Sequence, residues 1–486
     1  MSAGRRSAWL GLSQTLEVGL QALLAVLLVR HLTAVDFADY RLAWLIAGGA
    51  AALLPFAIPD VLSLLLPVKP AADRAAHVRV AFIALGGAGL AAAVVTWFGA
   101  GLSDAHAGLR ANALACAFLV GLSVPAVLLD YLPLADERGD WQARVSIVLA
   151  LLRTALAAWA VLAWEQLGAV LWTVAAVAAS RVALVALYGQ RRHHWLGARS
   201  AAAHWRAHFA LAAPLGISGL FFTLRRQADQ WIAAAAFAPV QFAAFSLGAV
   251  ASPLVLLVRR AVSLTLLPAM ARQHAQGDWG AVLDTNHRAN TAVACLAFAL
   301  LAFLGCFGEP IYDLVYTSRY REAVPVMRLM ALGWALQVIE LNSLVQFAGL
   351  MPRVARLQLV MLGISLAGAA AGGFVFGLPG LAAGGVLAIA AERAVMVRWL
   401  SAQLARPAAE IQPWRRLAAL AASCLAIGLC GRLLFELLPA GWPSWLRLAA
   451  AAPPMLVAYV LLVRGRGWWP ERLVPVESGS GDGRNP

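Results

Sequence analysis

Three charged residues interrupt an otherwise apolar stretch in the middle of the chain. The segment PLGISGLFFTLRRQADQWIAAAAF, residues 214–237, carries Arg225, Arg226 and Asp229. In a helix, residues three or four positions apart lie on one face, so the carboxylate could pair with either arginine. One carboxylate neutralises only one guanidinium group. The other cation is therefore expected to face water, a partner helix or an anionic ligand, with a buried structural pair as the alternative.

Other apolar segments also carry polar residues near their middle. Gln14, Glu17 and Gln21 follow one helical stripe, and the stretch QVIELNSLVQ contains Glu340. A charge at the centre of a bilayer costs about 2.5–3.5 kcal/mol on insertion scales, which favours a functional role over chance. A single polar residue is more often satisfied by a hydrogen bond between helices. The predicted substrate-binding residues are Arg225, Arg226, Asp229, Gln14, Gln21, Arg153 and Asn342; the ion-coupling candidates are Glu17 and Glu340; Arg259 and Arg260 are secondary candidates.

The composition explains why these charges stand out. Of the 486 residues, 62% are hydrophobic and only 13% are charged, about half the charged share of a soluble domain. Apolar runs of about 20 residues, long enough to cross a bilayer as helices, recur along the chain. We therefore predict an all-α polytopic membrane protein with about 14 transmembrane helices. The predicted spans are 9–30, 41–66, 77–99, 107–132, 141–164, 166–189, 207–236, 239–267, 289–307, 324–350, 354–376, 378–402, 414–436 and 444–463.

The basic residues predict the orientation of these spans. Lys and Arg concentrate at the N-terminus, in the even-numbered loops and after the last span, where they mark the cytoplasmic side. This asymmetry accounts for the net charge of +14 and argues against nucleic-acid binding. The loops are too short for a soluble domain, and no phosphate-binding, hydrolase or metal motif is found. We predict a transporter, not an enzyme, with no metal and no cofactor.

A weak repeat suggests two halves. A shift of 205 residues aligns AVDFADYRLAWL, from Ala34, with PVQFAAFSLGAV, from Pro239. An even number of spans in each half gives two parallel six-helix bundles, with a substrate cavity expected between them. Chance similarity in an alanine-rich chain is the alternative. The predicted bounds are 1–206 and 207–405 for the bundles, 406–464 for two extra helices, and 465–486 for a disordered cytoplasmic tail.

Five motifs occur in order along the chain. They are LLVRHLTAVDFADYRLA in the first loop, AAPLGISGLFFTLRRQADQWIAA in the seventh span, PVQFAAFSLG before the eighth, LLPAMARQHAQGDW at its end, and EPIYDLVYTSRYREAVPVMRLMAL before the tenth. Together they resemble the polysaccharide transporter, or oligosaccharide flippase, family of the multidrug/oligosaccharidyl-lipid/polysaccharide exporter superfamily. The similarity extends over residues 5–400. Ala38 and Gln230 depart from the family pattern, in which glycine and a basic residue are usual at these positions.

The resemblance implies a function. It implies a V-shaped flippase that moves an undecaprenyl-pyrophosphate-linked oligosaccharide from the cytoplasmic to the periplasmic leaflet of the bacterial inner membrane by alternating access. The glycan would serve O-antigen, capsule or exopolysaccharide synthesis, with a proton or sodium gradient as the driving force. A glycan polymerase and a chain-length regulator are the implied partners. The alternatives are a cation-coupled small-molecule antiporter of the same superfamily and a membrane polysaccharide polymerase or ligase.

Overall fold

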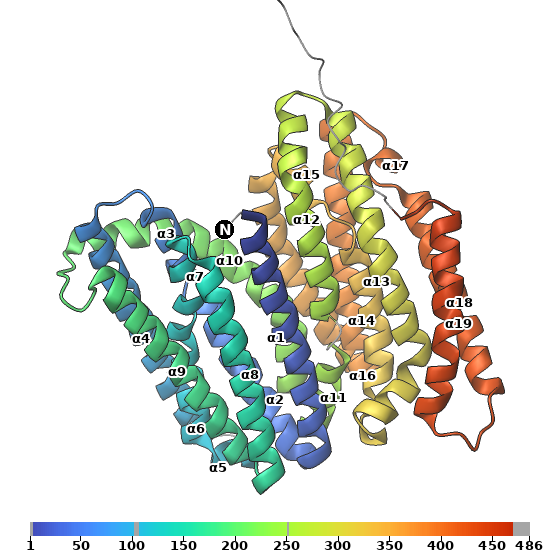
Figure 1. The fold of residues 1–486 in the computed structure, drawn as a ribbon, viewed down its shortest axis with the longest axis horizontal. Helices are drawn as coiled ribbons and strands as arrows, with labels where there is room; N and C mark the ends of the chain where they lie inside the picture. The colour runs from blue at the N-terminus through green and yellow to red at the C-terminus, as the bar shows by residue number, and fades with distance from the viewer. Residues whose placement is uncertain (1–2, 102–105, 250–251, 470–486) are drawn as a thin grey trace, which may run out of the picture. The chain divides into compact units, whose positions relative to one another are not determined.

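The computed structural model describes residues 3–101, 106–249 and 252–469. Helices form nearly all of this part of the chain, and it contains no strand (Figure 1), which confirms the all-α class. The first nine helices are α1 (Ala3–His31), α2 (Ala34–Leu53), α3 (Ile58–Leu65), α4 (Ala71–Gly101), α5 (Ala107–Ala111), α6 (Ala113–Ala126), α7 (Leu128–Ala135), α8 (Gly139–Trp164) and α9 (Leu167–His193).

The remaining helices follow along the chain. They are α10 (Ala202–Ala236), α11 (Pro239–Gly248), α12 (Ser252–Ala275), α13 (Trp279–Val315), the 3-10 helix η1 (Ser318–Tyr320), α14 (Ala323–Gln337), α15 (Asn342–Phe347), α16 (Met351–Leu404), α17 (Ala408–Ile411), α18 (Trp414–Leu437) and α19 (Ser444–Gly465). The predicted tail lies largely in residues 470–486, outside the described residues.

Within the described residues, 12 helical segments are long and apolar enough to cross a membrane, so the protein is a multi-pass membrane protein. Two differences separate this number from the 14 predicted spans. The predicted spans 354–376 and 378–402 both lie in α16, which is interrupted at Gly377 with φ 65° and ψ −149°. The predicted span 239–267 covers two helices, α11 and α12. Residues 250–251, which come between them along the chain, lie outside the described part.

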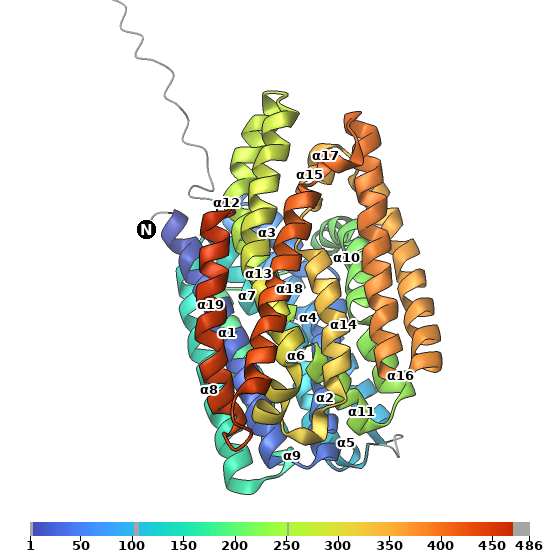
Figure 2. The same cartoon turned by 90° about the vertical axis from the view of Figure 1, so that its right-hand side faces the viewer.

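Gly377 turns the chain back on itself. Its backbone angles fall in a region that only glycine occupies readily. The parts of α16 on either side of Gly377 that belong to unit 1, as far as Gly385, run side by side (Figure 2), and glycines let them approach closely. A Cβ atom on Gly380 would collide with the Gly372 carbonyl group, and one on Gly384 would collide with the Gly368 carbonyl group. The sequence FGLPG therefore makes a hairpin of two helices.

The chain forms two compact units. Unit 1 comprises Met1–Val250, Val315–Met327 and Ala355–Gly385, and unit 2 comprises Ala251–Leu314, Arg328–Val354 and Val386–Pro486. These units do not test the domain bounds at residues 206 and 405, which stay a prediction.

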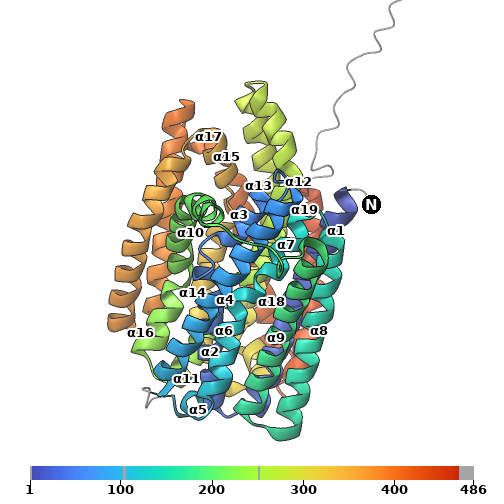
Figure 3. The same cartoon turned by 90° about the vertical axis from the view of Figure 1, so that its left-hand side faces the viewer.

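Aliphatic side chains form the core of unit 1. Residues such as Leu62, Val78 and Leu129 from α3, α4 and α7 are fully buried together. The helices α4, α6 and α9 lie side by side, and part of α10 is seen end-on beside them, so it crosses their direction (Figure 3). At Gly89 of α4 and Gly121 of α6 the two backbones meet, since small residues permit close helix packing in membranes.

Candidate functional site

A guanidinium group and a carboxylate meet inside unit 1. Arg153 of α8 lies with one Nη 3.5 Å from Oε1 of Glu17 on α1, and the Arg153 side chain is only 11% exposed. The guanidinium carbon also lies 5.4 Å from the centre of the Trp44 ring of α2. Both residues come from the middle of apolar helices that pack along each other. The structure therefore joins an ion-coupling candidate to a substrate-binding candidate.

Arg153 has more donors than these contacts use. Its Nε and its second Nη are buried, and neither has a hydrogen-bond partner among the described residues. An arginine carries five N–H donors, and buried donors are nearly always satisfied in proteins. A buried cation with orphaned donors in an apolar bundle is the arrangement expected where an anionic group binds transiently.

A second ion pair lies nearby in the same unit. One Nη of Arg181, on α9, donates to both carboxylate oxygens of Asp130, on α7, at 3.0 and 2.8 Å. Asp130 also accepts from Nε2 of Gln142 at 3.4 Å and lies close enough to Glu17 for the two carboxylates to interact. Neither Asp130 nor Arg181 is among the site residues predicted from the sequence. Their opposite charges in two separate apolar segments were the signal that could have revealed them.

The charged group on α10 is less enclosed. Arg226 is exposed, and its guanidinium carbon lies 5.8 Å from the Phe222 ring centre. Asp229 is half-buried and accepts the Gln230 amide N–H at 2.8 Å, and Arg225 is half-buried. Pairing of Asp229 with either arginine stays a prediction. Gln14 and Gln21 are half-buried on α1, on either side of Glu17 along the helix.

Unit 2 holds a second carboxylate–guanidinium pair, at a break in a helix. The predicted span 324–350 is interrupted between α14 and α15, and Glu340 occupies the break with its side chain 9% exposed. Nε of Arg259 lies 3.7 Å from Oε2 of Glu340, and an Nη donates to the Gln337 carbonyl at 3.0 Å. Discontinuous membrane helices often form the ion and substrate sites of transporters.

Three amide side chains support this break. Asn286 and Asn290 of α13 are buried; Asn286 donates to the Glu340 carbonyl at 3.1 Å, and Oδ1 of Asn290 accepts the Glu340 amide at 3.0 Å. Gln412 is fully buried and bonds both asparagines. The backbone groups freed by the break are thereby satisfied inside the protein, as a membrane interior requires. The sequence-based prediction missed these residues, although two asparagines four positions apart in the polar stretch DTNHRANT, residues 284–291, lie on one face of α13.

The other two candidates in unit 2 add little to this arrangement. Asn342 is exposed at the start of α15. The side chain of Arg260 lies outside the described residues.

Fold and ion pairs together define a multi-pass helical membrane protein that keeps carboxylate–guanidinium pairs inside apolar helices. The particular family follows from the sequence: residues 3–274 match the polysaccharide biosynthesis protein family, and the chain belongs to that family. This match confirms the resemblance seen in the sequence motifs. No curated protein is significantly similar to the chain.

Solved structures share its fold. The inward closed conformation of the lipid II flippase MurJ aligns with a TM-score of 0.67 at 12% identity, over 96% of this chain and 100% of MurJ. An inward-facing multidrug resistance MATE family transporter aligns at 0.58 and 13% identity, over 84% and 96%. A mutant of the Vibrio cholerae MATE transporter VcmN aligns at 0.50 and 15%, over 82% and 95%. At such identities the similarity establishes the fold.

Proposed function

We propose that the protein moves a polyprenyl-pyrophosphate-linked oligosaccharide, with undecaprenyl as the lipid, from the cytoplasmic to the periplasmic leaflet of the inner membrane by alternating access. The glycan would feed O-antigen, capsule or exopolysaccharide synthesis. Both termini and the even-numbered loops face the cytoplasm in this proposal, in keeping with their excess of Lys and Arg. Membership of the polysaccharide biosynthesis protein family supports the class of cargo.

The observation that carries this proposal is the state of Arg153. Its buried guanidinium has one carboxylate partner at 3.5 Å and two nitrogens without a partner among the described residues. A pyrophosphate offers several anionic oxygens, and charge-assisted hydrogen bonds to them gain strength away from water. The amides of Gln14 and Gln21, on the same helix as Glu17, suit the hydroxyl groups of a glycan.

The direct test is the Arg153→Gln variant. Purified protein in proteoliposomes would be assayed with a fluorescent polyprenyl-pyrophosphate disaccharide. Its movement between leaflets is measured by adding a quencher that removes the fluorescence of the molecules in the outer leaflet. One lost charge-assisted hydrogen bond is worth about 1.5–3 kcal/mol, so transport at low substrate should fall about 10- to 150-fold. The matched control is Arg144→Gln, on the same helix, where an exposed arginine pairs with Asp140 at 3.9 Å.

The outcomes separate the candidate functions. Loss of transport in Arg153→Gln with full transport in Arg144→Gln supports the proposal. Equal transport by both variants, at equal protein levels, removes Arg153 from substrate binding. Absence of lipid-linked glycan movement together with export of cationic dyes would favour the antiporter; a MATE transporter that shares the fold is named for multidrug resistance.

A further inference from the structure

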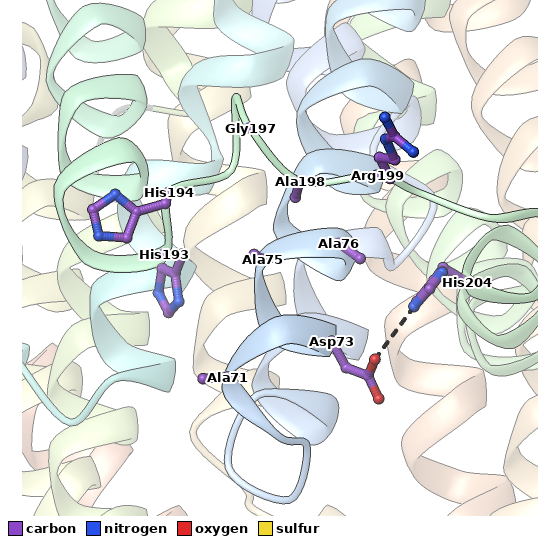
Figure 4. Close-up of a pocket in the computed structure, with 10 residues that line it drawn as sticks. All are labelled: Ala71, Asp73, Ala75, Ala76, His193, His194, Gly197, Ala198, Arg199 and His204. Carbon is purple, nitrogen blue, oxygen red and sulfur yellow. Dashed lines mark ion pairs between the residues drawn. The ribbon is translucent and has the colours of Figure 1, made fainter.

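A cavity of about 590 Å³ opens in unit 1, and its lining shares no residue with the side chains proposed for transport. The beginning of α4, the end of α9, the connection that follows it and the beginning of α10 form its walls (Figure 4). Small residues make up half of the lining. The complete lining is Ala71, Asp73, Ala75, Ala76, His193, His194, Gly197, Ala198, Arg199 and His204.

The connection between α9 and α10 is held firmly in place. Arg79 of α4 donates to the carbonyls of Leu196 at 3.0 Å and Ala198 at 2.5 Å. The Trp195 ring stacks on Phe82 at 4.4 Å, and its Nε1 donates to the Ala186 carbonyl at 3.1 Å. A loop anchored from two helices gives the cavity a preformed wall, and a preformed site loses little entropy when a ligand binds.

The segment that supplies most of the lining is strongly basic. Residues 191–206 contain four arginines and three histidines but no aspartate or glutamate. Of these, Arg199 and the three histidines line the cavity. The rule for cytoplasmic loops accounts for arginine in this segment, but it does not account for three histidines or for a concave surface.

Two carboxylates near the cavity are already engaged by histidines. Asp73 lies 3.6 Å from Nε2 of His204, and Asp136 lies 2.9 Å from Nε2 of His193. Burial alone would raise the pKa of the Asp136 carboxyl, but hydrogen bonds from His193 and Tyr188 hold it below its ordinary value. Each carboxylate thus has a histidine partner beside the cavity.

We propose that this cavity binds a phosphate group, carried either by an anionic lipid headgroup or by a soluble phosphate. Arg199 supplies a planar set of donors that matches phosphate oxygens. His194 adds an N–H donor, and the small Ala and Gly residues of the lining leave room for the group. Basic pockets at the cytoplasmic ends of membrane helices suit such headgroups.

The test uses the purified full-length protein and two probes. Inorganic phosphate, compared with chloride at equal ionic strength, is titrated while the thermal unfolding temperature is recorded. Phosphatidylglycerol, compared with phosphatidylcholine, is measured by its retention in native mass spectrometry. The variants are Arg199→Gln and His194→Asn, because asparagine tolerates the positive φ of 52° at residue 194. The control is Arg191→Gln, which removes a charge from the same segment outside the cavity lining.

The proposal expects saturable binding of at least one probe, weakened at least about tenfold by Arg199→Gln and by His194→Asn. Arg191→Gln should change it less than about twofold. Binding of phosphate without lipid retention identifies a soluble ligand, and the reverse identifies a headgroup. Absence of binding of both probes overturns the proposal. An equal loss of probe binding in Arg191→Gln also overturns it, because the whole basic segment would then attract the phosphate. Neither result bears on the transport test at Arg153.

Discussion

Glu17 and Glu340 share two properties at the level of single residues. Glu17 lies within an apolar helix and Glu340 at the break within an apolar span, and each has a guanidinium within 4 Å, at 3.5 Å from Arg153 and 3.7 Å from Arg259. Proton binding to either carboxylate would remove its half of the ion pair and free the arginine for an anionic ligand. We propose that competition between the coupling cation and the arginine for the carboxylate couples substrate binding to an ion gradient.

The prediction for coupling is made with isosteric amides. Glu17→Gln and Glu340→Gln together should still carry substrate down its gradient, because the arginines remain. The double variant should lose the acceleration that an imposed proton or sodium gradient gives the natural protein. Transport in proteoliposomes with and without each gradient measures this. Glu165→Gln is the control, since the Glu165 side chain is 68% exposed. Unchanged gradient dependence in the double variant would remove both residues from coupling.

Sequence predicts which residues are unusual but not which of them meet. Arg153 and Glu340 stand out because a charge within an apolar run is costly. Their partners are 136 and 81 residues away along the chain, and no periodicity connects residues so far apart. Asn286, Asn290 and Gln412 were missed for a related reason. Their role depends on the break at Glu340, which 3.6-residue periodicity did not reveal.

At the level of elements, the turn residues predicted a helix end correctly, whereas the predicted number of spans differs from the number of long apolar helical segments in the structure. The sequence FGLPG predicts the end of one span and the start of another, and Gly377 makes that turn. The periodicity of the sequence does not predict the close contact of the two arms of α16, because this contact depends on which glycines face each other. Gly368, Gly372, Gly380 and Gly384 do so, whereas a Cβ atom added to Gly385 would meet no heavy atom within 4 Å outside its own helix.

This contact predicts opposite results for two adjacent glycines. Gly384→Ala pushes a methyl group into the Gly368 backbone, and such overpacking typically costs about 1–3 kcal/mol. Gly385→Ala enters open space and should gain up to about 1 kcal/mol of helix propensity. Thermal unfolding in detergent should therefore show a lower temperature for Gly384→Ala and an equal or higher one for Gly385→Ala. Equal stability of the two variants would contradict the close packing of the arms.

At the level of the whole molecule, one contact bears on the predicted repeat. Nε of Arg41 on α2 donates to Oγ of Ser246 on α11 at 2.8 Å, and the two residues are 205 positions apart, the shift that aligned the two halves. Elements related by a two-fold axis meet at equivalent positions where they cross that axis. Contact between equivalent residues therefore supports a repeat with a pseudo-two-fold axis near α2 and α11, which both belong to unit 1.

The last prediction uses this contact. If the predicted halves move against each other during transport, α2 and α11 must shift in every cycle, and a covalent bridge between them should stop it. The variant carries Arg41→Cys and Ser246→Cys in a chain whose five native cysteines are replaced by serine. A short bis-methanethiosulfonate crosslinker, which forms a disulfide with each cysteine and releases methanesulfinate, should abolish glycan transport, and a reductant should restore it. Each single-cysteine variant, treated alike, should keep its rate. Full transport with the bridge verified by mass spectrometry would mean that α2 and α11 stay together throughout the cycle, and the moving parts would then be divided elsewhere than at residue 206.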